Sequence, residues 1–260
     1  MKYIAIIPAR YASTRFPGKP LALLGGMTII ERVYRRVSEA VSDVYVATDD
    51  ERIFKTVENF GGNAVMTSPS HKSGTDRIEE AVTKISAEKG VEYDIVINVQ
   101  GDEPFVDVSQ IATLMEAFSD PDVEIATLGK PFIGQGQKPE EQHIHAICNV
   151  NSPKVVVSLK GYALYFSRSV IPFIRGKEQA EWPAAFPYLK HIGLYAYRRE
   201  VLHDVTQLPQ SPLEKAESLE QLRWLENGYS IKVGVTDIET IGIDTPEDLM
   251  RAEDFLKGRN

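Results

Sequence analysis

Residues 4–19 read Ile-Ala-Ile-Ile-Pro-Ala-Arg-Tyr-Ala-Ser-Thr-Arg-Phe-Pro-Gly-Lys, and this stretch decides the fold class. The apolar run Ile4–Ile7 ends at Pro8, which predicts a β-strand followed by a loop. The loop contains three cations: Arg10, Arg15 and Lys19. Open α/β proteins bind their ligands in loops at the carboxyl ends of such strands. The stretch therefore predicts an α/β fold with an anion site after its first strand.

The charge around this loop differs from that of the whole chain. No Asp or Glu occurs before Glu31, whereas the complete chain has a formal net charge of -8. A local excess of cations in an acidic protein favours a compact, strongly anionic ligand, and a nucleoside triphosphate fits. The spacing matches neither a Walker A loop nor a Gly-x-Gly-x-x-Gly fingerprint. A solvated basic turn is the alternative interpretation.

Length and composition exclude several other classes of protein. The 260 residues are enough to bury a large core, and 43% hydrophobic with 25% charged residues is ordinary for a globular protein. The acidic balance argues against broad phosphate neutralisation on a nucleic acid. The single cysteine, Cys148, excludes an intrachain disulfide and a cysteine-based zinc site. Residues 1–20 lack a secretory pattern and no apolar run is long enough for a membrane span, so we expect a cytoplasmic protein.

Strand and helix patterns alternate over the first half of the chain. The predicted strands are Tyr3–Ile7, Val44–Ala47, Ala64–Met66 and Ile95–Val99. Apolar residues at helical spacing predict helices at 28–41, 53–60, 78–85 and 111–118. This order predicts a doubly wound, mostly parallel sheet.

The second half is less regular. Residues 129–153 have weak periodicity and residues 171–187 are rich in proline, so both are predicted to be irregular. Two strands joined at Lys160-Gly161, a strand at 192–197, a helix at 213–224, strands at 231–235 and 241–243, and a helix from Pro246 complete the prediction. We interpret residues 1–260 as one α/β domain with a β-rich insertion at about 129–198.

Two aspartates each follow a predicted strand. Asp102 comes after the buried strand that ends at Val99, and Asp244 precedes the helix that Pro246 opens. Thr245 and Asp248 are enough for a capping box, so Asp244 is free for another role. A carboxylate beside a polyphosphate is repulsive unless a cation lies between them, and Mg²⁺ on carboxylates and phosphate oxygens satisfies this. Plain turn residues are the alternative interpretation for both.

Three other segments carry weaker signals. Ser73-Gly74-Thr75-Asp76-Arg77 begins a helix whose N-terminus can hold an anion, but a plain capped helix start is equally consistent. A lone histidine such as His191 and an arginine such as Arg168 are more often structural. The acidic residues of the 213–224 helix are expected on a solvated face: Glu214, Glu217 and Glu220.

The motifs taken together closely resemble the 3-deoxy-manno-octulosonate cytidylyltransferase (CMP-Kdo synthetase) family, over about residues 3–256. The motifs that carry the resemblance are Ile-Pro-Ala-Arg-Tyr-Ala-Ser-Thr-Arg-Phe-Pro-Gly-Lys-Pro (7–20), Ser-Gly-Thr-Asp-Arg (73–77), Asn-Val-Gln-Gly-Asp-Glu-Pro (98–104), Tyr-Ala-Leu-Tyr-Phe-Ser-Arg (162–168), Ser-Pro-Leu-Glu (211–214) and Gly-Ile-Asp-Thr-Pro-Glu-Asp-Leu (242–249). The first loop alone suggests only the wider nucleotidyltransferases. Residues 129–153 and 172–187 depart from the family pattern.

The resemblance implies a fold, a reaction and a partner. The fold is of the nucleotide-diphospho-sugar transferase type, with the β-rich insertion used to form a homodimer. The reaction is CTP plus Kdo giving CMP-Kdo and diphosphate, with Mg²⁺, in bacterial lipopolysaccharide biosynthesis. Activation of another acidic sugar, such as a sialic acid or an amino analogue of Kdo, and a non-catalytic nucleotide-binding regulator are the alternatives.

The resemblance also implies roles for individual residues. Catalytic roles fall to Lys19, Arg10 and Asp102. Nucleotide binding falls to Arg10, Ser13, Arg15, Lys19, Ser73, Gly74, Arg77 and Asp102. The sugar pocket is implied to comprise Gln100, Arg168, His191, Tyr195 and Glu220. The metal ligands are implied to be Asp102 and Asp244.

Overall fold

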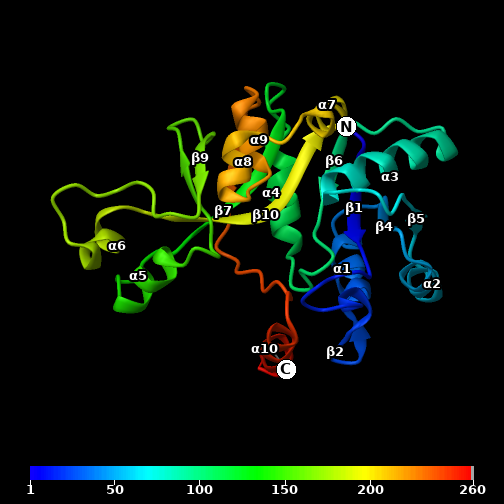
Figure 1. Cartoon of the computed structure of the whole chain (residues 1–260), viewed down its shortest axis with the longest axis horizontal. Coiled ribbons are helices and arrows are strands. Elements are labelled where there is room, and N and C mark those ends of the chain that lie inside the picture. The colour runs from blue at the N-terminus through cyan, green and yellow to red at the C-terminus, as the bar shows by residue number, and fades with distance from the viewer. Residues whose placement is uncertain (259–260) are drawn as a thin grey trace. The chain divides into compact units, whose positions relative to one another are not determined.

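Strand β1 (Tyr3–Ala9) is the central strand of the first of two compact units in the computed structural model, which describes residues 1–258 (Figure 1). The first unit comprises residues 1–112, 196–206 and 240–258, and the second comprises residues 113–195 and 207–239. The predicted single domain with an insertion at about 129–198 stays a prediction.

The first unit contains a parallel sheet in the order β6-β1-β4-β5. Its other strands are β4 (Val44–Thr48), β5 (Ala64–Met66) and β6 (Ile95–Asn98). Every residue of β4 and β6 is buried, as expected for strands that are covered on both faces. Because β1 and β6 are paired in parallel, their carboxyl ends lie side by side, and the loops that follow them share one edge of the sheet.

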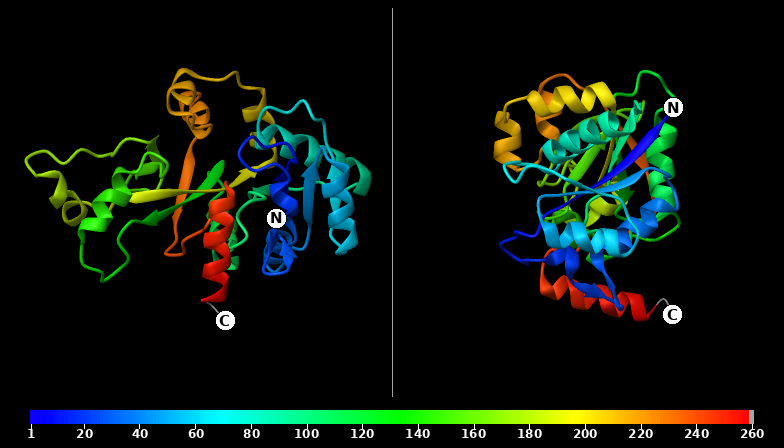
Figure 2. Two further views of the ribbon diagram at one scale, coloured as in Figure 1. Left: turned by 60° about the horizontal axis from the view of Figure 1, so that its bottom comes forward. Right: turned by 90° about the vertical axis from the view of Figure 1, so that its right-hand side faces the viewer.

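The helices of this unit are α1 (Ile29–Ser38), α2 (Glu51–Asn59), α3 (Gly74–Lys89), the first half of α4 (Val108–Ala117), α7 (Arg199–Gln207) and α10 (Pro246–Lys257). Two of them, α3 and α10, begin at the caps that the sequence predicts. The capping box that Thr245 and Asp248 predict for α10 is present. Figure 2 shows α10 beside the short hairpin of β2 (Leu23–Leu24) and β3 (Met27–Thr28), where Leu256 approaches Gly25.

The second unit is β-rich. Its strands are β7 (Ile125–Pro131), β8 (Lys154–Val157), β9 (Ala163–Ser167), β10 (Leu189–Arg198, whose last three residues belong to the first unit) and β11 (Ile231–Val235). Strand β11 pairs with β7 in parallel, and β8 pairs antiparallel with both β9 and β10. The helical segments are α5 (Glu141–Cys148), η2 (Gln179–Glu181), α6 (Trp182–Ala185), α8 (Pro212–Glu217) and α9 (Gln221–Glu226). The predicted α/β class with a mostly parallel sheet is confirmed.

Several predicted elements are wrong. The segment 129–153 contains the end of β7 and helix α5, and α7 was missed altogether. The helix predicted at 213–224 is broken into α8 and α9 at Ser218, which has a left-handed backbone with φ 52°. The strand predicted at 241–243 does not form, so Asp244 follows an extended segment. None of the helices among residues 1–258 is long and apolar enough to cross a membrane.

Candidate active site

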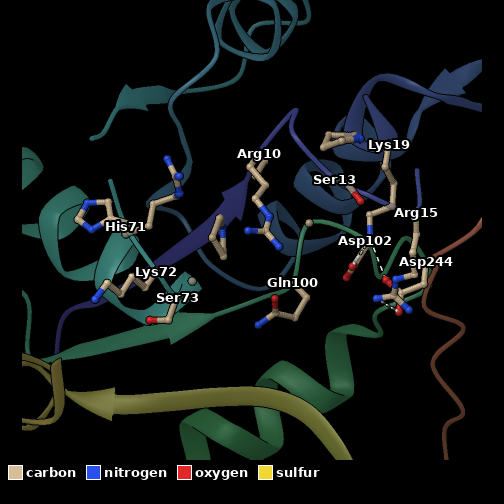
Figure 3. Close-up of a pocket in the computed structure, with 16 residues that line it drawn as sticks. Arg10, Ser13, Arg15, Lys19, His71, Lys72, Ser73, Gln100, Asp102 and Asp244 are labelled. Carbon is tan, nitrogen blue, oxygen red and sulfur yellow. Dashed lines mark hydrogen bonds and ion pairs between the residues drawn. The ribbon is translucent and has the colours of Figure 1, made fainter. Parts of the chain in front are cut away.

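A cavity of about 240 Å³ opens in the first unit where β1, β6 and α3 bring their loops together (Figure 3). Its walls come from the loop after β1, the N-terminus of α3, the turn after β6 and the segment before α10. The lining residues are Pro8, Ala9, Arg10, Ser13, Arg15, Lys19, Pro20, His71, Lys72, Ser73, Gly74, Arg77, Gln100, Gly101, Asp102 and Asp244. All the residues predicted to bind nucleotide or metal therefore line one cavity.

The loop after β1 is held by its own hydrogen bonds. The Gly18 N–H donates to the Tyr11 carbonyl at 2.9 Å, and Ser13 Oγ accepts from the Phe16 N–H at 3.3 Å. Gly18 has φ 71°, and a Cβ there would lie 3.0 Å from the Tyr11 ring. Only glycine adopts this conformation without strain in so narrow a space. The closed loop ends at η1 (Lys19–Leu21), which places Lys19 at the cavity wall.

The turn after β6 approaches β1 so closely that it excludes a side chain. A Cβ on Gly101 would lie 2.9 Å from the Pro8 carbonyl oxygen. The next residue, Asp102, accepts a backbone hydrogen bond at 2.9 Å from the Ile243 N–H. These two close approaches bring Asp102 and Asp244 to the same side of the cavity, although they lie far apart in the sequence.

Opposite charges meet at this side of the cavity. The Lys19 ammonium nitrogen lies 2.6 Å from Asp102 Oδ2 and 3.1 Å from Asp244 Oδ1. Arg15 contacts the other oxygen of Asp244 at 3.1 Å. The Lys19 side chain is 14% exposed, whereas that of Arg15 is 65% exposed. Lys19 is thus the largely buried cation that joins the two carboxylates, and Figure 3 shows it between them.

Two other cations of the cavity, Arg10 and Lys72, have no carboxylate partner among residues 1–258. Arg10 and Lys72 are exposed, and neither forms an ion pair with any of residues 1–258. Sequence reasoning did not select Lys72, although its position next to the Ser73 cap was a usable signal. These two side chains are free to meet an anion that enters the cavity.

The N-terminus of α3 forms a further wall. Ser73 and Asp76 form a reciprocal capping box, which orients the first turn of the helix toward the cavity. Arg77 is only 5% exposed, and its guanidinium donates to Thr67 Oγ1 at 2.5 Å and pairs with Asp49 at 3.4 Å. Arg77 therefore lines the cavity as an already satisfied group.

The two carboxylates fit a hard divalent cation. One oxygen of Asp102 and one of Asp244 face the same nitrogen atom, so a single cation can neutralise both. Mg²⁺ is typically bound by one or two carboxylates together with phosphate oxygens and water. Among residues 1–258, no group of three or more His, Cys, Asp or Glu residues is placed to hold a metal. The donor set therefore suits a cation whose other ligands come from a phosphate-bearing substrate and solvent.

Residues predicted to bind the sugar lie in both units. Gln100 lines the cavity of the first unit and donates to Asn98 Oδ1 at 3.2 Å. The other four belong to the second unit: Arg168, His191, Tyr195 and Glu220.

Arg168 follows β9 and is tied to backbone carbonyl groups. Its guanidinium donates to the carbonyls of Glu217 at 2.6 Å, Val150 at 3.0 Å and Ser218 at 3.3 Å. The carboxylate of Glu217 accepts from the Arg168 backbone N–H at 2.9 Å and from Ser167 Oγ at 2.6 Å. Arg168 thus stabilises the junction between α8 and α9. Its remaining guanidinium N–H groups are not used in these three hydrogen bonds.

His191 and Tyr195 lie on the same face of β10. Their rings are 5.4 Å apart, and Tyr195 packs edge-on against Trp224 at 5.2 Å. Thr127 Oγ1 lies 3.1 Å from His191 Nε2 and donates to the Leu194 carbonyl at 2.8 Å. Because the nearby Leu194 and Ile192 carbonyls can only accept, we assign the single Thr127 hydroxyl hydrogen to them, and this assignment makes Nε2 of His191 the donor and Nδ1 the acceptor. Burial lowers the pKa of His191 to about 3, so the ring is neutral.

The solvated acidic face predicted for residues 213–224 is wrong. Glu214 is 6% exposed and forms a two-point ion pair with Arg223, at 2.8 and 2.7 Å. Arg223 also lies 3.6 Å from Glu220, the predicted sugar-binding carboxylate. Glu214 belongs to the capping box at the start of α8, and Glu217 accepts hydrogen bonds from Ser167 and Arg168, so neither lies on a solvated face.

Comparison with known proteins identifies what the whole chain is similar to. The cytidylyltransferase family model matches residues 4–238. The 3-deoxy-manno-octulosonate cytidylyltransferase of Bacteroides thetaiotaomicron is 59% identical, over 100% of both chains. The enzyme of the same name from Fusobacterium nucleatum is 45% identical, over 100% of this chain and 99% of its own.

Solved structures agree with the sequence relatives. A CMP:2-keto-3-deoxy-manno-octonic acid synthetase complexed with CTP aligns with a TM-score of 0.88 and 40% identity, over 100% of both chains. A 4-diphosphocytidyl-2C-methyl-D-erythritol synthase from Anaerococcus prevotii aligns with a TM-score of 0.57 and 14% identity, over 98% of this chain and 99% of its own. The second likeness shows a shared fold alone.

Proposed function

Because the chain belongs to the 3-deoxy-manno-octulosonate cytidylyltransferase family, we propose that it couples CTP to Kdo, giving CMP-Kdo and diphosphate. This reaction activates the sugar for bacterial lipopolysaccharide biosynthesis. The observation that carries the proposal is the cavity, in which unpaired cations stand opposite two paired carboxylates. A triphosphate with a divalent cation matches both halves of this charge pattern.

The cations of the cavity would bind and orient the triphosphate. Arg10 and Lys72 have free donors for phosphate oxygens, and the first turn of α3 offers a positive helix end. In the reaction the anomeric hydroxyl oxygen of Kdo bonds to the α-phosphorus of CTP, and the bond from that phosphorus to the diphosphate breaks. The hydroxyl proton goes to solvent, and the leaving diphosphate takes the electron pair. Fixed cations near the diphosphate favour this charge development.

A divalent metal ion is expected in enzymes of this family. We assign it as Mg²⁺, with Asp102 and Asp244 as its protein ligands, because the two carboxylates face a common point. When bound, the ion would neutralise phosphate charge and so make the α-phosphorus easier to attack.

The second unit would bind the sugar acid. Arg168 retains N–H donors for a carboxylate, and the neutral His191 offers Nδ1 as an acceptor for a sugar hydroxyl. Tyr195, Glu220 and Gln100 complete the proposed set. A homodimer formed through the β-rich residues is also part of the proposal.

A diphosphate-release assay tests the function directly. Four nucleoside triphosphates are crossed with Kdo, its 8-amino analogue and a sialic acid. Release is expected with CTP and Kdo, and a preference of more than about tenfold for another acidic sugar would overturn the substrate assignment.

Asp102→Asn tests the metal site while keeping the shape of the side chain. We expect turnover to fall at least about a hundredfold, because a neutral amide holds a divalent cation poorly. The thermal unfolding midpoint should stay close to that of the unchanged protein. Undiminished diphosphate release from this variant would remove Asp102 from the reaction.

A further inference from the structure

The ammonium group of Lys19 occupies the place that a metal ion bound to Asp102 and Asp244 would need. Its ammonium group lies between Asp102 and Asp244, at 2.6 and 3.1 Å, in the position that a cation shared by both carboxylates would take. An ammonium ion and a divalent cation repel each other, so only one of them can stay between these oxygens. The side chain is largely buried, so this contact is a defined part of the site.

The geometry of Lys19 allows its ammonium group to leave without moving the loop. The backbone N–H of Lys19 donates to the Phe16 carbonyl at 3.2 Å, and Gly18 closes the loop ahead of it. The four-carbon side chain is flexible beyond this fixed backbone, and the cavity that receives the phosphates begins beside it. Rotation about side-chain bonds would therefore move the ammonium group from the carboxylates into the cavity while the loop stays in place.

We propose that Lys19 is an exchangeable counter-ion that couples metal binding to nucleotide binding. In the nucleotide-free protein its ammonium group neutralises Asp102 and Asp244. A divalent cation displaces it, and the released ammonium group then pairs with phosphate oxygens of the nucleotide. This inference rests on the proposed function for the identity of the nucleotide, but the exchange itself concerns only the protein and the metal. Each ligand should consequently strengthen the binding of the other.

A neighbouring cation, Lys72, separates this proposal from a general charge effect. Lys72 lines the same cavity and has no carboxylate partner among residues 1–258, so it does not compete with a metal for Asp102 or Asp244. Lys72→Met removes the same charge as Lys19→Met at a different place. The pair of variants therefore distinguishes direct competition from a change in the potential of the cavity.

The test is a titration of the purified full chain with Mn²⁺, followed by the electron paramagnetic resonance signal of free Mn²⁺. No nucleotide and no sugar are present. Lys19→Met should bind Mn²⁺ at least about tenfold more tightly than the unchanged protein, because its competitor is gone. Lys72→Met should change the affinity by less than about twofold. Lys19→Arg, which keeps the charge, should remain a weak binder.

Three controls keep the outcome clear. Asp102→Asn in the Lys19→Met background should abolish the tight Mn²⁺ binding, which locates it. Thermal unfolding of each variant checks that the chain is folded, and Lys19→Gln, which also removes the charge, replaces Lys19→Met if that variant is unstable. Equal or weaker Mn²⁺ binding by Lys19→Met, or an equal gain in Lys72→Met, overturns the exchange.

Failure of the exchange and failure of the proposed function are distinguishable. Because the titration contains no substrate, a negative titration with normal diphosphate release removes only the exchange. A positive titration with no turnover of CTP and Kdo removes the substrate assignment and leaves the exchange in place.

Discussion

Gly101 illustrates how one missing side chain positions a functional carboxylate. The 2.9 Å that separates its ideal Cβ position from the Pro8 oxygen is shorter than a real contact, so any other residue must push the turn away from β1. Asp102 is the next residue in the chain and would move with it. Nothing in the local sequence reveals this requirement, because Pro8 belongs to another strand.

Gly101→Ala should therefore reduce activity more than the small size of the added methyl group suggests. We expect the diphosphate-release rate to fall at least about tenfold, and the free energy of unfolding to fall by about 1–3 kcal/mol. Gly242→Ala is the matched control, because a Cβ at Gly242 meets no atom within 4 Å. If both variants keep full activity, the close approach does not control Asp102.

The neutral His191 predicts a pH dependence of stability. Its pKa is about 3 in the folded chain against an ordinary value of 6.5, so between these values the unfolded chain binds a proton that the folded chain does not. The contribution of the neutral His191 to the free energy of unfolding is fully present above about pH 6.5. It is lost as the pH falls toward 3, at up to about 1.4 kcal/mol per pH unit. Urea unfolding from pH 4 to pH 7 should show a slope that is smaller in His191→Gln. Identical slopes in the two proteins would show that His191 titrates normally.

At the scale of elements, the alternation of strand and helix in the first half was readable from the sequence. Continuous apolar runs and helical spacing located β1, β4, β5, β6, α1, α2, α3 and α4, with boundaries differing by a few residues. Helix α5 was missed because its residues carry little amphipathic pattern. The break between α8 and α9 was missed because a serine in a left-handed conformation has no sequence signal, and its contact with the Arg168 guanidinium comes from a distant part of the chain.

Ser218 gives a prediction about that break. A left-handed backbone costs a non-glycine residue about 1–2 kcal/mol, and Ser218 adopts φ 52°. Ser218→Gly should leave stability unchanged or raise it by up to about 1 kcal/mol, whereas Ser218→Val should lower it by more than about 1 kcal/mol. Gly228 has φ 87° and open space around it, so Gly228→Ser is the reverse test. This substitution should lower the free energy of unfolding, because it places a side chain on a left-handed backbone. Chemical denaturation measures all three, and a stabilised Ser218→Val would contradict the account.

At the scale of the whole molecule, the predicted homodimer has a candidate surface. The hairpin of β8 and β9 carries apolar side chains that the isolated chain leaves in water: Val157, Leu159 and Leu164, which are 36%, 109% and 64% exposed. Exposed apolar side chains gathered on one hairpin are typical of protein–protein contacts. They occur in the β-rich residues for which the sequence resemblance implies dimerisation.

Leu164→Arg should weaken this homodimer, because a charge would be buried in an apolar contact. Sedimentation velocity at several protein concentrations should show a shift of at least about tenfold in the dimer dissociation constant. Met250 is 59% exposed on α10, outside the β-rich residues, so Met250→Arg is the control that should sediment as the unchanged protein does. A monomer at every concentration before substitution would end the dimer prediction, and a Leu164→Arg protein that dimerises normally would move the contact elsewhere.

The sequence by itself determined the α/β class, the acid-free cationic loop, the capped helix starts and the family. These features depend on residues that are close together in the chain, where periodicity and capping chemistry act locally. Only the tertiary structure decided that Lys19 meets Asp102 and Asp244, which lie 83 and 225 residues away in the chain. It also decided that Arg168 is tied to backbone carbonyls and that Thr127 orients His191. Such contacts depend on how strands pair and how loops close over distance, so no local pattern encodes them.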